Sequence, residues 1–193
     1  MMTLANYGLR SNQDKDPTSA KALNKSFQVR NKAETLLKQC IKSYYHIPVD
    51  KRNEILDITR DYYRRVPFDL LIWNHDEVKQ CIVDSILLLD IRFDPYKAAA
   101  AFNKVEEMLV NLVKLPWHEE FRRIYTYSGQ FRMVVSDPLF GVEDVLAAAG
   151  YTSDTSDNQP MHLYLPDSKM PQKDDGKSIT GLLFDCLLAQ EWQ

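Results

Sequence analysis

Residues 115–151, LPWHEEFRRIYTYSGQFRMVVSDPLFGVEDVLAAAGY, decide the fold because the hydrophobic period changes twice within them. Pro116 ends a preceding helix, since proline cannot continue the helical hydrogen bonds. Residues 123–127 and 130–135 are two β-prone runs, and Ser128-Gly129 between them suits a tight turn with a positive φ. The sequence therefore predicts a short β-hairpin at this point.

A helix is predicted directly after the hairpin, over residues 142–149. Gly150 follows it as a residue able to adopt the left-handed conformation that ends helices, and Tyr151 is placed to fold back on it. Residues 152–160 are a predicted polar loop. Residues 162–165 are a predicted third strand, so the expected sheet has three antiparallel strands.

The rest of the chain has mainly helical hydrophobic spacing. Helices are predicted to begin at Thr18 or Ser19, after the N-cap residues Asp50, Asn74 and Asp94, and after Lys177. The helix after Asn74 has apolar residues on more than one stripe and is expected to be the most buried, whereas the last one is expected to be amphipathic. Because that last pattern runs out without a cap, we expect a fragment of a longer protein.

The predicted fold class is α+β and mainly helical, a helix bundle with a small three-stranded antiparallel sheet. Residues 1–17 are polar and without hydrophobic periodicity, so they are expected to form a flexible N-terminal arm. Residues 18–193 are expected to form one domain.

The composition is that of an ordinary globular protein, with 45% hydrophobic and 26% charged residues among 193. A net charge of -3 gives no general attraction to nucleic acid. The three cysteines, Cys40, Cys81 and Cys186, are far apart in helical patterns, which is typical of a reduced intracellular protein. No stretch approaches the ~20 apolar residues that cross a bilayer. The protein is expected in the cytoplasm, or in both the cytoplasm and the nucleus.

Patterns of catalysis and metal binding are missing from the sequence. The four histidines stand far apart, and none belongs to an HExxH or CxxC arrangement. No glycine-rich loop follows a strand, so a phosphate cradle is not expected. The acidic pairs Glu106-Glu107 and Glu119-Glu120 have basic neighbours, as on a solvated surface. We therefore expect no metal and no cofactor, and a binding protein in place of an enzyme.

Aromatic and basic residues gather around the predicted hairpin. Tyr125 and Tyr127 would share one face of the first strand, and Phe131 and Met133 one face of the second. One of these pairs should cover the helices, and the other can be open to a partner. A positive rim is expected from four neighbouring side chains, those of His118, Arg122, Arg123 and Arg132. The alternatives are half-buried packing for the tyrosines and solvated arginines without a partner.

The same stretch resembles the PUB domains, which occur in peptide N-glycanase and in proteins with UBA or UBX domains. The likeness rests on spaced residues, namely Trp117, Phe121-Arg122-Arg123-Ile124, Phe131, Gly141-Val142-Glu143-Asp144-Val145-Leu146, Gly150-Tyr151 and His162-Leu163-Tyr164-Leu165-Pro166. It is strongest within residues 115–151, and it is most similar to the spermatogenesis-associated adaptor and Tamozhennic group. The resemblance implies a helical bundle with a three-stranded antiparallel sheet at one end.

The resemblance also implies a function. Typical PUB domains hold a short acidic peptide in a groove beside the first strand, where an asparagine usually fixes the peptide backbone; Ser128 stands at that place here. In the spermatogenesis-associated adaptors, a Tyr and a small hydroxyl residue at this place belong to the surface that binds the catalytic domain of the cylindromatosis-type deubiquitinase. Tyr127 and Ser128 match these two positions, and the neighbouring Tyr125, Arg123 and Arg132 complete the expected partner-binding site.

Three functions are then open. The first is a non-catalytic adaptor that links this deubiquitinase to a linear-ubiquitin ligase complex, docked by a separate segment, in inflammatory or cell-death signalling. The alternative is a groove that docks an acidic peptide, ending in Tyr or Leu, of an AAA ATPase or a ubiquitin ligase. The third is a regulatory helical module of a larger enzyme.

Overall fold

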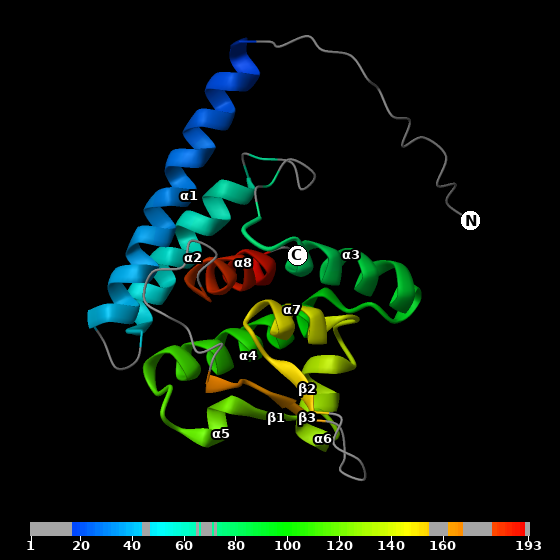
Figure 1. Cartoon of the computed structure of the whole chain (residues 1–193). Coiled ribbons are helices and arrows are strands. Elements are labelled where there is room, and N and C mark those ends of the chain that lie inside the picture. The colour runs from blue at the N-terminus through cyan, green and yellow to red at the C-terminus, as the bar shows by residue number, and fades with distance from the viewer. Residues whose placement is uncertain are drawn as a thin grey trace.

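The computed structural model describes residues 17–43, 47–64, 66, 71, 73–154, 162–167 and 179–191. The elements in chain order are α1 (Pro17–Ser43), α2 (Val49–Tyr63), α3 (Asp76–Leu89), the 3-10 helix η2 (Asp90–Arg92), α4 (Pro95–Lys114), α5 (Glu119–Arg122), β1 (Arg123–Tyr125), α6 (Gly129–Phe131), the π-helix η3 (Arg132–Ser136), α7 (Val142–Ala148), β2 (Thr152–Asp154), β3 (His162–Tyr164) and α8 (Ile179–Gln190). Helices form most of the molecule, and a small sheet lies at one end of it (Figure 1). The predicted α+β class is therefore confirmed. The predicted flexible arm lies outside the described residues, apart from Pro17, where α1 begins.

The helix α8 lies at the centre of the bundle. It touches α1, α2, α3 and α4, and Figure 1 shows it between them. Every side chain from residue 182 to residue 189 is buried, which is the pattern of a helix covered on all sides. The prediction of an amphipathic last helix is therefore wrong. The prediction that α3 is the most buried helix is also wrong, because Leu87 and Leu88 near its end are exposed.

Of the three predicted helix caps, the one at Asp94 is confirmed and the other two are wrong. Asp50 lies inside α2, which has Pro48 at its N-cap position. The carboxylate of Asp94 accepts hydrogen bonds from the backbone N–H groups of Tyr96 and Lys97, at 3.0 and 3.3 Å. This is the predicted cap of α4. The expected cap at Asn74 does not form, because α3 begins with His75 at its N-cap position. The side chain of Asn74 takes part in a polar network instead.

The sheet has the strand order β1-β3-β2, and both pairs are antiparallel. β1 pairs with β3, with Arg123 opposite Tyr164 and Tyr125 opposite His162. β2 also pairs with β3, although its residues belong to the segment that was predicted to be a polar loop. The three-stranded antiparallel sheet is confirmed, but the sequence identified only β1 and β3 among its strands.

The predicted hairpin strand over residues 130–135 is wrong, because this segment is helical. Ser128 has φ -63 and ψ 138, and its Oγ accepts a hydrogen bond from the N–H of Phe131 at 3.3 Å, which caps α6. The N–H of Asp137 then bonds five residues back, at 2.8 Å, as in a π-helix. Gly129 has no positive φ. Phe131 and Val135 are buried one turn apart, so helical spacing brings both to the core.

The predicted helix after this segment is confirmed as α7. Gly150, with φ 101, adopts the left-handed conformation at its end. Tyr151 folds back as expected, and its N–H donates to the carbonyl of Leu146 at 3.2 Å. Its buried hydroxyl donates to the carbonyl of Phe121 at 2.6 Å, and burial raises the pKa of this hydroxyl. Tyr151 thereby joins α7 to α5, directly before the sheet begins.

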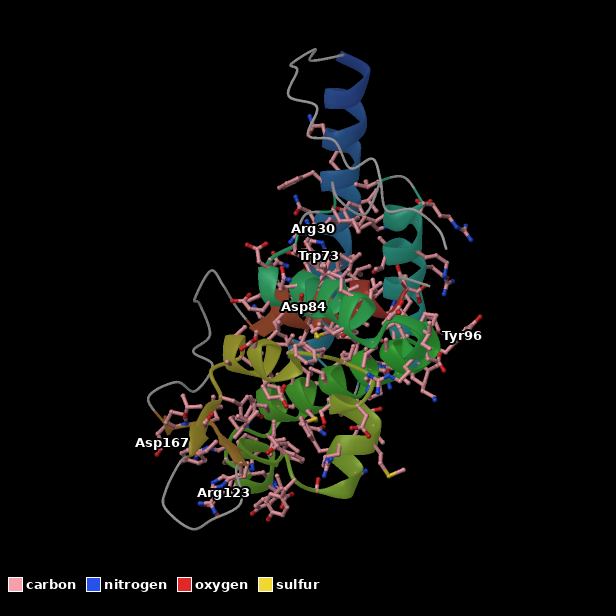
Figure 2. All side chains as sticks on the ribbon, turned by 90° about the vertical axis from the view of Figure 1, so that its right-hand side faces the viewer. Arg30, Trp73, Asp84, Tyr96, Arg123 and Asp167 are labelled. Carbon is pink, nitrogen blue, oxygen red and sulfur yellow. The ribbon has the colours of Figure 1, made fainter. Side chains whose placement is uncertain are left out.

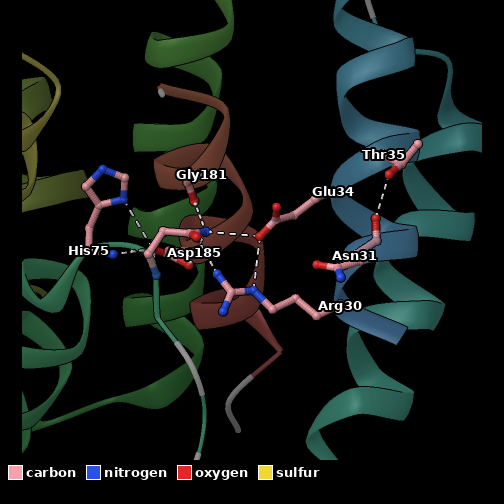
Figure 3. Close-up of polar contacts among 8 residues, drawn as sticks. Arg30, Asn31, Glu34, Thr35, His75, Gly181 and Asp185 are labelled. Atoms are coloured by element: carbon pink, nitrogen blue, oxygen red, sulfur yellow. Dashed lines mark hydrogen bonds and ion pairs between the residues drawn. The ribbon is translucent and has the colours of Figure 1, made fainter. Parts of the chain in front are cut away.

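A buried polar network ties α1, α3 and α8 together (Figure 3). Asp185 of α8 has no exposed surface, and one of its carboxylate oxygens accepts the backbone N–H groups of Asn74 and His75, both at 2.8 Å. Nδ1 of His75 lies 3.3 Å from the same oxygen. Arg30 of α1 donates to the side chain of Asn74 and pairs with Glu34 at 3.0 Å. The network therefore holds the start of α3 between the other two helices.

Replacement of Asp185 by Ala should lower the free energy of unfolding by about 3 kcal/mol, because two buried backbone N–H groups lose their acceptor. Urea denaturation followed by circular dichroism measures this change. The control is Asp57→Ala, since Asp57 is 72% exposed and pairs with Arg60 on the surface. A loss no larger than that of the control would show that the network does not stabilise the fold.

Asp185→Asn tests the charge of this side chain. Burial raises the pKa of Asp185 above its ordinary value of 3.8, and hydrogen bonds from His75 oppose that shift. A carboxyl group whose pKa is raised by folding holds its proton more tightly in the folded state, so its contribution to stability falls as pH rises through the window above 3.8. The stability of the wild type relative to Asp185→Asn should therefore decrease as pH is raised from about 4. A difference that does not vary with pH would contradict this.

Candidate protein-interaction site

A groove of about 290 Å³ lies between β1, α4 and the turn formed by α6 and η3. Its apolar lining consists of Met108, Phe121, Ile124, Phe131, Val134 and Val135. Its polar lining consists of Lys104, Asn111, Glu120, Arg123, Tyr125, Ser128 and Gln130. β1 is an edge strand, so this groove lies beside a strand that has a sheet partner on one side only.

Two exposed tyrosines stand at the end of β1, beside the groove. The side chains of Tyr125 and Tyr127 are 48% and 52% exposed. Their rings meet edge to face, with the centroids 5.8 Å apart. Within the described part of the chain, neither hydroxyl has a hydrogen-bond partner. Of the two residue pairs that could have been open to a partner, the tyrosine pair is open as a unit, whereas Phe131 is buried and Met133 is exposed.

The two neighbouring arginines have different roles. Arg123 is exposed, and its guanidinium lies 5.7 Å from the ring centroid of Tyr164. Arg122 donates to the hydroxyl of Tyr164 at 2.9 Å and to the carbonyl of Leu165 at 3.1 Å, and it pairs with Asp167 at 2.6 Å. Figure 2 shows Arg123 and Asp167 at the same end of the molecule. Arg122 therefore holds the end of β3 in place. The prediction that it belongs to an exposed positive rim is wrong.

Three of the five predicted partner-binding residues meet at the groove. Arg123, Tyr125 and Ser128 line it, and Tyr127 stands next to them through its contact with Tyr125. Arg132 is exposed but does not line the groove. The Oγ of Ser128 is already engaged in capping α6.

The wall that α4 contributes to the groove escaped the sequence analysis. Lys104, Met108 and Asn111 follow one another at helical spacing, and all three line the groove. This spacing is visible in the sequence beside the buried stripe of α4, and it is the signal that could have identified the wall. Lys104 donates to Glu107 at 2.8 Å, and the acidic Glu120 also lines the groove. The positive charge of the groove is therefore modest.

Comparison with known proteins identifies the part of the chain that contains the groove. Residues 92–184 match the family model described as "Spermatogenesis-associated protein 2, PUB-like domain". These residues, slightly less than half of the chain, are similar to a PUB-like domain. The predicted resemblance is thus confirmed, and the PUB-like domain includes the groove and all three strands.

A curated relative points to the same group as the family model. "Protein tamozhennic" of Drosophila melanogaster is 34% identical to this chain over 59 residues. The aligned part is 31% of this chain and 7% of that protein. The chain therefore corresponds to a small part of this relative's length.

The groove of the PUB-like domain is suited to recognition. PUB-like domains are generally non-catalytic, and they act by binding other proteins. In the part of the chain that the structure describes, no three His, Cys, Asp or Glu side chains are placed to hold a metal ion. None of the described helices is long and apolar enough to span a membrane. The match to a PUB-like family model is what supports a protein-interaction role.

Replacement of Ser128 by Ala should lower the free energy of unfolding by about 1 kcal/mol, because the side chain that caps α6 is lost. Thermal or urea denaturation measures the loss. Gln130→Ala is the matched control, since Gln130 also lines the groove but is exposed and caps nothing. Equal stability of the two variants would show that Ser128 has no structural role.

Proposed function

We propose that the PUB-like domain is a non-catalytic adaptor that binds the catalytic domain of a cylindromatosis-type deubiquitinase through Tyr125, Tyr127 and the adjoining rim of the groove. The whole protein would link this enzyme to a linear-ubiquitin ligase complex in inflammatory or cell-death signalling. The observation that carries the proposal is the exposed tyrosine pair, because its packing does not serve the core.

The tyrosine pair is well prepared for binding. The N–H of Ser128 donates to the carbonyl of Tyr125 at 3.0 Å, and the N–H of Arg132 donates to the carbonyl of Ser128 at 3.0 Å. The turn that carries Tyr127 is therefore held on both sides. A rigid aromatic surface loses little conformational freedom on binding, so most of its contact energy is available for affinity.

The mechanism that we propose is scaffolding. The domain holds the deubiquitinase near the ligase complex. This raises the effective concentration of the deubiquitinase at the ubiquitin chains that the ligase makes. The exposed Arg123 beside the tyrosine pair favours a partner surface with carboxylates at its rim. The chemical steps take place in the partner enzymes.

Tyr127→Ala should raise the Kd for the isolated deubiquitinase catalytic domain at least about thirtyfold while the circular dichroism spectrum stays unchanged, because a central aromatic anchor is lost. Isothermal titration calorimetry measures the Kd. Tyr96→Ala is the matched control: Tyr96 is 73% exposed, and Figure 2 shows it far from Arg123. An unchanged Kd for Tyr127→Ala would remove this surface from the proposal.

A second candidate function is supported by the groove itself. Its apolar lining can hold a Tyr or Leu side chain of a peptide from an AAA ATPase or a ubiquitin ligase. Lys104 and Arg123, which also line the groove, can form ion pairs with acidic residues of that peptide.

Fluorescence anisotropy with an acidic, Tyr-ending peptide tests the second candidate. Binding should weaken as salt is added, because the charges are screened, and Arg123→Glu should weaken it further. Arg132→Glu should not, because Arg132 does not line the groove. Absence of binding at low ionic strength would contradict the peptide-docking function, and the adaptor function would be the one that remains.

A further inference from the structure

The end of α3 carries an apolar surface that the proposed function does not use. The side chains of Leu87, Leu88 and Ile91 are 65%, 53% and 94% exposed. Single exposed apolar residues are common in proteins. Here, however, large aliphatic side chains follow each other closely at the end of a helix, where the solvent face is normally polar. This apolar tip, defined by residues 87–92, has no cover among the described residues.

The backbone next to Ile91 is strained. Asp90 has φ 45 and ψ -117, and it is the only non-glycine residue with a positive φ in the described part of the chain. Its N–H donates to the carbonyl of Ile86, and its carbonyl accepts the N–H of Phe93 at 3.0 Å, so the turn is held on both sides. Strain of this kind persists where its surroundings enforce it, and it is concentrated at functional positions. The strained turn presents Ile91 to solvent.

Opposite charges flank Ile91. Asp90 and Arg92 are both exposed, and neither forms an ion pair with another described residue. Side chains two positions apart do not face each other on a helix, so these two charges are poorly placed to pair within one chain. A two-fold axis near Ile91 would bring Asp90 of each chain to Arg92 of a second copy.

We propose that the apolar tip is a homodimer contact, in which residues 87–92 of two copies pack against each other about a two-fold axis near Ile91. A two-fold interface uses the same patch on both subunits and therefore requires a patch that complements itself. An apolar centre with one acid and one base at its border meets this requirement. A border with charges of a single sign would repel a second copy.

The apolar tip is far from the groove of the PUB-like domain. Figure 1 shows the end of α3 and the sheet at different places on the molecule, and Figure 2 separates Asp84 of α3 from Arg123 in a second view. A dimer through the tip would leave both grooves open. The result is a bivalent adaptor, whose avidity for a clustered partner exceeds the affinity of one groove.

Sedimentation velocity of residues 1–193 over a range of micromolar concentrations tests the proposal. The wild type should show a monomer–dimer equilibrium, and Ile91→Asp should raise the dimer Kd at least about thirtyfold. Val49→Asp is the matched control, because Val49 is also exposed, at 75%, but lies at the start of α2. A wild type that stays monomeric, or a dimer that Ile91→Asp leaves unchanged, would overturn the proposal.

Charge reversal tests the two-fold pairing itself. Arg92→Asp and Asp90→Lys should each weaken self-association, because like charges then face each other. An equimolar mixture of the two variants should form a heterodimer, because every pair across the axis is again of opposite sign. A mixture that stays monomeric would overturn the pairing. Circular dichroism checks that each variant folds. If Asp90→Lys does not fold, the single variants Ile91→Asp and Arg92→Asp test the proposal, since each should weaken self-association.

Discussion

The arrangement of the helices depends on one carboxylate in the middle of the core. Asp185 lies on the helix that all the large helices touch, and a charge in that position would be costly without partners. One of its oxygens accepts the backbone N–H groups of both Asn74 and His75, so the start of α3 is fixed relative to α8. Arg30 adds α1 through the side chain of Asn74. Because α4 packs along the same central helix, the wall of the groove takes its position from it as well.

The helical framework could be predicted from hydrophobic spacing, but the second half of the supposed hairpin could not. Phe131, Met133 and Val135 alternate as in a strand, yet Phe131 and Val135 also suit a helix. The cap that Ser128 provides and the packing of η3 on α4 select the helix, and the second of these is a tertiary contact. β2 is short and polar, so its strand conformation comes from pairing with β3 and not from its own residues.

The candidate site could be predicted only where neighbours in sequence are also neighbours in space. Tyr125 and Ser128 lie at the end of the predicted strand, and both line the groove. Arg122 and Arg123 are identical neighbours in sequence, but they have different partners in space. Arg122 bonds to the hydroxyl of Tyr164 and to Asp167, whereas Arg123 lies over the Tyr164 ring. The wall from α4 depends on which face the core leaves open. That property belongs to the assembled bundle.

The central position of α8 also determines when the protein can fold. This helix comes after every other described helix in the chain, so the ribosome makes α1 to α4 before the surface on which they pack exists. Until residues 179–190 emerge, the apolar faces of α1 to α4 that pack on α8 remain in water. The N–H groups of residues 74 and 75 also lack the carboxylate to which they donate. Contacts so distant in sequence form late and leave a nascent chain prone to aggregation. Synthesis of this bundle therefore creates an interval in which a chaperone has a defined apolar surface to protect.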